Sequence, residues 1–137
     1  MALWNQSSML PEEQVRSSLV AYMVRMLGYP RELISLEKEI ALLPHLSHLP
    51  KKTIPKRRVD ILVFSKNMEP LLMVECKAGF LHTEHRKQLL SYNTFVCAPF
   101  IALVNGDEQW FAERGSLTFQ EGFMSYAEVL RATDSTI

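Results

Sequence analysis

Three ionisable residues interrupt two neighbouring apolar segments of this 137-residue chain: Asp60 lies in the first segment, and Glu75 and Lys77 lie in the second. Apolar strands rarely carry ionised side chains, because removing a charge from water is costly unless the charge is paired. Two carboxylates can hold Mg²⁺ or Mn²⁺, since these cations prefer oxygen ligands. A lysine beside them can orient a water molecule or stabilise developing negative charge. These residue types therefore predict metal-dependent hydrolysis of phosphodiesters.

Two strands joined by a turn would position these groups. Residues 57–64 and 71–78 have strand character, and the turn-like segment 65–70 between them predicts an antiparallel hairpin. Because side chains alternate along a strand, Glu75 and Lys77 share one face and lie about 7 Å apart.

Asp60 is expected on the face of its strand opposite Val59 and Ile61. If the hairpin closes near residues 66–69, Asp60 lies close to Glu75. The alternative interpretation is a salt-bridged charge cluster at the edge of a sheet. Three charged groups within apolar strands favour a functional site, because perturbed charges gather at such sites.

The rest of the chain alternates between helical and strand periodicity. The expected elements are a helix that opens at Pro11 and stops at residues 28–30, a strand over 33–42, a loop over 43–56, a helix over 83–96, a strand over 100–104, a hairpin formed by 109–112 and 117–119, and a helix over 126–130. The order α-β-β-β-α-β, followed by further β elements, predicts an α/β fold with a central mixed sheet flanked by helices.

The composition is that of a single globular domain over residues 1–137, with a hydrophobic fraction of 47% that argues against disorder. No apolar run approaches the roughly 20 residues that span a bilayer, and no signal peptide is recognisable. The expected location is therefore the cytoplasm. Basic and acidic residues number 15 each, so binding to nucleic acid requires a local patch of positive charge.

A basic run immediately precedes the strand that carries Asp60. Such a loop is often only solvated, but beside a metal site it could bind phosphates, because these contacts depend on the placement of charge. The candidate nucleic-acid-binding residues are Lys51, Lys52, Lys56, Arg57 and Arg58.

From about Pro11 to Trp110, the sequence resembles the PD-(D/E)xK nuclease superfamily. Within it, the chain is similar to the small N-terminal nuclease domain of type I restriction enzyme R subunits and to stand-alone relatives of that domain. The motifs that carry the resemblance are residues 11–16 as the opening helix, 28–30 as its end, Glu37 in the first strand, 58–61 as the strand with the aspartate, 75–77 as E-x-K, 88–92 as Q-x-x-x-Y and 104–106 as an N-G turn. Val59 stands where the superfamily name has proline. The order and spacing of the set, rather than E-x-K alone, make the resemblance fairly specific.

The resemblance implies a restriction-endonuclease-like core and a role for each matching residue. Asp60 and Glu75 would bind the metal, and Lys77 would be catalytic. Gln88 and Tyr92 would face the site from the second long helix, one turn apart.

The resemblance also implies that an acid of the first helix lies near the metal. Glu13 is favoured over Glu12, and Glu37 is a further candidate. A helix often carries acids at its start for another reason, because negative charge suits the positive end of the helix dipole.

Three functions are compatible with these residues. The leading one is Mg²⁺- or Mn²⁺-dependent DNA cleavage by an endonuclease related to restriction enzymes. The second is a catalytically weak DNA-binding or scaffold module of a larger restriction or repair complex, which the formal net charge of zero favours. The third is a dimerisation module, since cutting a duplex needs two sites; Phe123, Met124 and Tyr126 could form that interface or close the core. The expected partners are DNA, restriction or repair subunits and a second copy of the chain, and no membrane.

Overall fold

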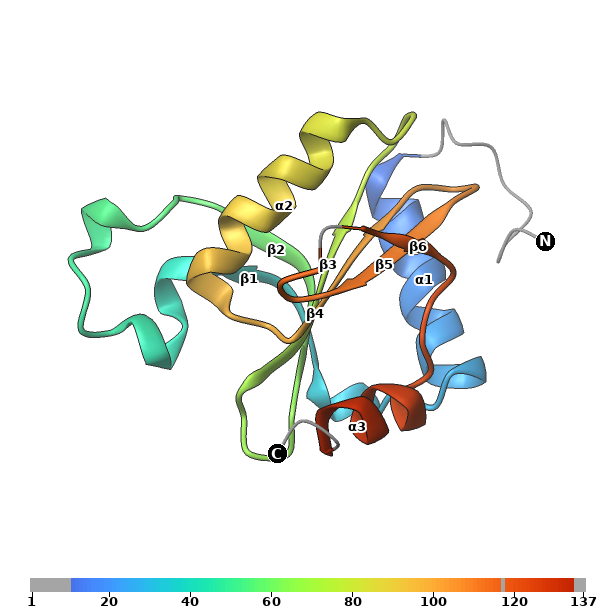
Figure 1. The fold of residues 1–137 in the computed structure, drawn as a ribbon, viewed down its shortest axis with the longest axis horizontal. Helices are drawn as coiled ribbons and strands as arrows, with labels where there is room; N and C mark the ends of the chain where they lie inside the picture. Colours follow the sequence, from blue (N-terminus) through green and yellow to red (C-terminus); the bar gives the residue numbers. More distant parts are fainter. Residues whose placement is uncertain (1–10, 117, 135–137) are drawn as a thin grey trace.

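In the part of the chain that the structure describes, residues 11–116 and 118–134, six strands form one mixed sheet with each strand beside the next in chain order (Figure 1). The structure is a computed structural model. The strands are β1 (Ile34–Glu39), β2 (Arg58–Phe64), β3 (Pro70–Cys76), β4 (Phe100–Val104), β5 (Gln109–Glu113) and β6 (Gln120–Glu121). The α-helices are α1 (Glu12–Met26), α2 (Thr83–Val96) and α3 (Tyr126–Asp134), and short 3-10 turns form at Arg31–Leu33, Ile40–Leu42, Pro44–Leu46 and Lys51–Thr53.

Neighbouring strands of this sheet run antiparallel except β3 and β4, which are parallel. A parallel pair needs a crossover connection, and α2 supplies it. α2 and the segment 40–57 cover one face of the sheet, whereas α1 and α3 cover the other (Figure 1). The buried side chains accordingly form two core clusters, one on each face of the sheet.

The predicted order α-β-β-β-α-β is confirmed, as is the mixed sheet flanked by helices. The bounds predicted for the long helix over 83–96 and for the strand over 100–104 are those of α2 and β4. The strand expected over 33–42 is shorter, because the chain leaves the sheet after Glu39 and enters the 3-10 turn Ile40–Leu42.

The end of the chain differs more from its prediction. The strand expected over 117–119 is displaced, since the partner of β5 is β6 at Gln120–Glu121, and Leu117 lies outside the described residues. The helix expected over 126–130 continues to Asp134. None of the described helices is long and apolar enough to cross a membrane.

The residues that follow β6 pack onto the core. Gly28 has a φ of +80°, which lets the chain turn sharply after α1 and bury Tyr29. The Tyr29 hydroxyl donates to the Met124 carbonyl oxygen at 2.8 Å. Its ring centre lies 6.2 Å from that of Phe123 and 5.5 Å from that of Tyr126. These C-terminal side chains therefore help to close the core on the α1 face.

Candidate functional site

β2 and β3 bring Asp60 and Glu75 together. The strands pair antiparallel with Ile61 opposite Val74, so the next position on each strand holds one of the two acids. Their side chains lie close enough for the charge of Asp60 and a hydrogen bond from it to raise the pKa of Glu75. Asp60 Oδ2 also accepts a hydrogen bond from the backbone N–H of Cys76 at 2.7 Å. The hairpin alone thus holds both carboxyl groups in one place.

The expectation that Asp60 lies opposite both Val59 and Ile61 is wrong. Val59 packs in the core cluster on the α2 face, whereas Ile61 packs in the cluster on the α1 face. Side-chain alternation therefore breaks at Asp60. The residue at the same level of β1 is Glu37, which has a φ of +50°. Because positive φ is uncommon for residues other than glycine, the irregularity extends across both strands.

Glu75 is an acid that the fold has removed from water. Only 5% of its surface is exposed, and in the described part of the chain its Oε1 atom has no hydrogen-bond partner. Burial raises the pKa of Glu75 to about 8, helped by the charge and hydrogen bond of Asp60 and opposed by Lys77 and Arg57. The pair therefore keeps a proton at neutral pH, which a bound cation would displace.

Lys77 directly follows β3, and its loop is anchored to the end of β4. The backbone N–H of Lys77 donates to the Val104 carbonyl oxygen at 2.8 Å. Asn105 is fully buried and donates from Nδ2 to the Gly79 carbonyl oxygen at 2.9 Å. Its Oδ1 accepts two backbone N–H groups of its own turn, at 2.9 and 2.7 Å. Asn105, which sequence reasoning identified only as part of a turn, thus holds the segment after Lys77 in place.

α1 adds Glu12 and Arg16 to this region. An Arg16 guanidinium nitrogen lies 3.3 Å from a carboxylate oxygen of Glu37, which ties the helix to the irregular part of β1. The negative charge of Glu12 acts on Cys76 and on His85. The start of α1 therefore lies beside the end of β3 and the start of α2.

Glu13, the acid favoured from the sequence, and Glu12 are both exposed on α1. Val15 and Leu19 are the buried positions of this helix, and Glu12 precedes Val15 by three residues, which places the two on the same face. Helical spacing is thus a signal that favours Glu12. A metal-binding role of Glu13 stays a prediction.

Tyr92 and Arg57 connect α2 with the basic run. The guanidinium carbon of Arg57 lies 5.4 Å from the centre of the Tyr92 ring, and the charge of Arg57 acts on Glu75. Gln88, one turn before Tyr92, is exposed. Tyr92 therefore contacts an arginine whose charge reaches Glu75, while the catalytic roles of Tyr92 and Gln88 stay predictions.

The other basic candidates lie around a hollow of about 370 Å³. Its lining consists of Glu39, Ala41, Leu42, Lys51, Pro55, Lys56, Arg57 and Arg58. Arg58 also forms an ion pair with Glu39 at 3.6 Å, and Lys52 is exposed on the same short turn as Lys51. The fold thus gathers the positive charges on one surface, and nucleic-acid binding there stays a prediction.

Comparison with known protein families identifies the family of the chain. A family model described as "Type I restriction enzyme R protein N terminus" matches residues 11–126, which run from the start of α1 to the first residue of α3. The chain belongs to this family. No curated protein has a matching sequence. Membership of the R-protein N-terminus family is consistent with a role in restriction.

The acid pair of the site can offer a metal two side chains. In residues 11–116 and 118–134, no group of three or more His, Cys, Asp or Glu side chains is arranged to hold a metal ion. Asp60 and the unpartnered Oε1 of Glu75 nevertheless provide hard oxygen ligands. Mg²⁺ is commonly bound through one or two carboxylates and keeps several waters, so the pair fits this ion.

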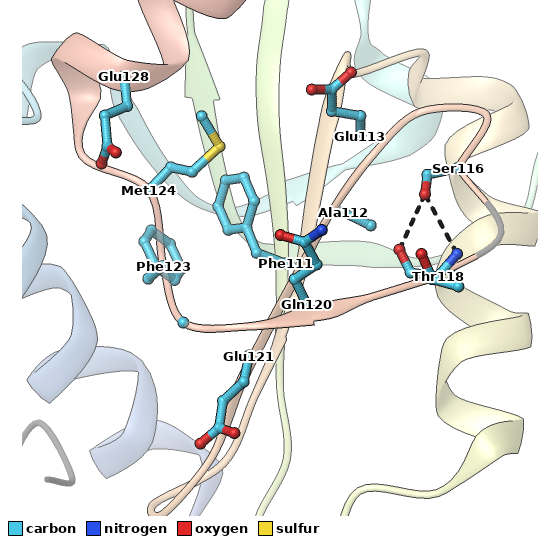
Figure 2. Close-up of a pocket in the computed structure, with 11 residues that line it drawn as sticks. Phe111, Ala112, Glu113, Ser116, Thr118, Gln120, Glu121, Phe123, Met124 and Glu128 are labelled. Atoms are coloured by element: carbon cyan, nitrogen blue, oxygen red, sulfur yellow. Dashed lines mark hydrogen bonds between the residues drawn. The ribbon is translucent and has the colours of Figure 1, made fainter.

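A separate pocket of about 320 Å³ lies at the β6 edge of the sheet (Figure 2). Its lining includes the apolar side chains Phe111, Phe123 and Met124 and the acidic side chains Glu113, Glu121 and Glu128. Glu128 accepts a hydrogen bond from the Ser125 backbone N–H at 2.9 Å and thereby caps α3. Neither acid of the Asp60–Glu75 pair lines this pocket, so it is distinct from the candidate site.

The raised pKa of Glu75 predicts that the metal-free protein loses stability as the pH rises. The folded state holds the proton up to about pH 8, whereas an unperturbed glutamate releases it near 4.5. Between these values the folded state binds more protons, so the free energy of unfolding falls with increasing pH. Thermal unfolding between pH 5 and 8.5 should therefore show a steeper decrease in Tm for the wild type than for Glu75→Gln.

His85 works against this trend, because burial, followed by the charges of Lys77 and His82, lowers its pKa. Its effect is present in both proteins and cancels in the comparison. Parallel pH profiles of the two proteins would contradict the assignment of a retained proton to Glu75.

Proposed function

We propose that this chain is a Mg²⁺- or Mn²⁺-dependent DNA endonuclease with a restriction-endonuclease-like core of the PD-(D/E)xK type. The observation that carries the proposal is the pairing of Asp60 with the buried Glu75, whose Oε1 has no hydrogen-bond partner among the described residues and which feels the charge of Lys77. A protein has little reason to bury such an oxygen unless a cation or substrate satisfies it, because the unpaired group costs free energy. Family membership supports a setting in restriction.

Each residue of the site has a distinct task in this proposal. Asp60 and Glu75 hold the metal, which when bound supplies a Lewis acid and lowers the pKa of a coordinated water. Lys77 orients the attacking water and stabilises the negative charge that develops on the phosphate. Tyr92 holds Arg57 at the edge of the site, and Gln88 contacts the substrate from the same helix.

The five basic residues of the run, Lys51, Lys52, Lys56, Arg57 and Arg58, bind the DNA backbone in this proposal. Phosphate contacts position a duplex without reading its sequence. The chain has a formal net charge of zero, so the local surface around the hollow must provide the attraction.

The decisive test is cleavage of supercoiled plasmid DNA by the purified chain with Mg²⁺ or Mn²⁺. Nicked or linear product that depends on the metal and disappears with chelator is the expected result. Calorimetric titration with Mn²⁺ on the same sample is expected to show binding in the micromolar to millimolar range. A pure protein that binds no metal and leaves supercoiled, linear and single-stranded DNA intact would overturn the proposal.

A second candidate function is a catalytically weak DNA-binding or scaffold module of a restriction complex. The two-acid metal site favours it, since no third acid within the described residues completes the site. DNA binding without turnover, unchanged by Lys77→Ala, would select this function. The same samples can be tested for a homodimer by light scattering, because a duplex cut needs two sites.

A further inference from the structure

Arg86 of α2 lies against the faces of two aromatic rings. Its guanidinium carbon is 5.1 Å from the ring centre of Trp110 and 5.5 Å from that of Phe119. The Trp110 indole N–H donates to Glu108 Oε2 at 3.1 Å, which fixes the ring. Within residues 11–116 and 118–134, no carboxylate lies at ion-pair distance from Arg86. Arg86 is therefore held against the two rings without a direct ion pair among the described residues.

The sheet places this arginine close to the acid pair. Glu75 of β3 is paired with Leu103 of β4, and Leu103 is paired with Trp110 of β5. Paired residues of neighbouring strands face the same side, and Leu103 packs in the core cluster on the α2 face. Two strand spacings of about 4.8 Å put Trp110 roughly 10 Å from Glu75 on that face.

The first turns of α2 connect the two positions. His85 directly precedes Arg86, and the charges of Lys77 and Glu12 both act on the His85 ring. The His85 Nδ1 accepts the backbone N–H of His82 at 3.1 Å, which fixes the start of the helix. Arg86 consequently lies on the part of α2 that borders the candidate site.

We propose that Arg86 binds a DNA backbone phosphate that flanks the phosphate held at the acid pair, and that Trp110 and Phe119 pre-position its guanidinium for this contact. The inference rests on the proposed function and deepens it by adding a second phosphate subsite. Guanidinium presents a planar set of donors that matches a phosphate, and stacking on rings reduces the freedom lost on binding. Because each DNA strand carries one phosphate per 3.4 Å of helix axis, a second backbone phosphate can lie within roughly 10 Å of the first.

The test is the salt dependence of DNA binding, measured by fluorescence anisotropy with a fluorescein-labelled 20-bp duplex in EDTA, so that no cleavage occurs. Arg86→Gln is expected to bind several-fold more weakly than wild type at the lowest salt. The slope of log K against log salt should also become shallower by about 0.9, the value for one neutralised phosphate. Arg25→Gln, at the exposed far end of α1, should match the wild type in both respects.

Phe119→Leu serves as a second variant, because it keeps the charge of Arg86 and removes one of the two ring faces. It is expected to weaken binding while the salt slope stays that of wild type. A purely structural role of Arg86 would lower the Tm of Arg86→Gln and leave the slope unchanged. Equal slopes for Arg86→Gln and wild type, or no binding by wild type at any salt concentration, would overturn this subsite.

Failure of this inference can be told apart from failure of the proposed nuclease activity. Metal-dependent plasmid cleavage together with an unchanged slope for Arg86→Gln rejects the Arg86 contact alone. If Arg86→Gln gives a shallower salt slope but the wild type cleaves no DNA, the contact between Arg86 and a phosphate is supported, and the chain is a DNA-binding module rather than a nuclease.

Discussion

Asp60→Asn is expected to abolish Mn²⁺ binding and to lower plasmid cleavage about 10³-fold or more, as large a loss as removal of a key charge-stabilising group. The substitution fits the fold. The new amide oxygen can still accept the backbone N–H of Cys76, a bond that Asp60 makes at 2.7 Å. The new amide nitrogen can donate to Glu75. The site thus loses a negative charge and an oxygen ligand while its hydrogen bonds stay satisfied.

Calorimetric titration and plasmid cleavage on the same samples measure this effect. Glu113→Gln is the matched control, because it removes one exposed acid at the end of β5 and should leave metal binding and cleavage unchanged. The Tm of metal-free Asp60→Asn should equal or exceed that of the wild type, since the repulsion between the two acids is relieved. Metal binding that survives Asp60→Asn would mean that the acid pair is structural.

Lys77→Met is expected to reduce turnover about 10²- to 10³-fold while Mn²⁺ binding is retained. The methionine keeps the apolar stem of the side chain and removes only its charge. The backbone N–H at this position still donates to the Val104 carbonyl oxygen, so the loop stays anchored. Because the Lys77 charge opposes a cation at Glu75, metal affinity should stay the same or increase.

Single-turnover cleavage at saturating metal separates this effect from metal binding. Lys87→Met is the control, because Lys87 lies on α2 in an exposed ion pair with Glu84 at 3.4 Å. It should cleave at the wild-type rate. If Lys77→Met cleaved as fast as this control, Lys77 would have no part in the chemistry and would be a surface charge.

Electrostatics explains why these two predictions are separable. Glu75 is buried and the negative charge of Asp60 raises its pKa, so the main contribution of the two acids is to attract a cation. Lys77 lies just after β3, and its positive charge repels a cation bound at Glu75. Its expected contribution is therefore to stabilise negative charge on a substrate. A metal-binding assay and a rate assay therefore report on different residues.

The sequence by itself determined the elements that depend on neighbouring residues. Hairpin signals at 65–70 predicted that β2 and β3 pair, and this pairing is what brings Asp60 to Glu75. The spacing of apolar residues located α2 and β4, because the buried face of a helix or strand leaves a regular pattern in the sequence. These features require only contacts that are local or close along the chain.

The tertiary structure alone decided which distant residues surround the acid pair. The charge of Glu12 acts on Cys76 of β3 because α1 packs through the face that carries Val15. The break in alternation at Asp60 arises where β1 and β2 deviate together at Glu37, which no pattern within one strand can reveal.

The ring contacts of Arg57 and Arg86 also depend on the tertiary structure, because they join residues that are distant in the chain. Arg57 meets Tyr92 from 35 positions away in the chain, and Arg86 meets Trp110 from 24 positions away. Composition counts such charges but does not locate them. Their place follows from how α2 packs across the sheet, and that packing depends on the buried contacts of the whole chain.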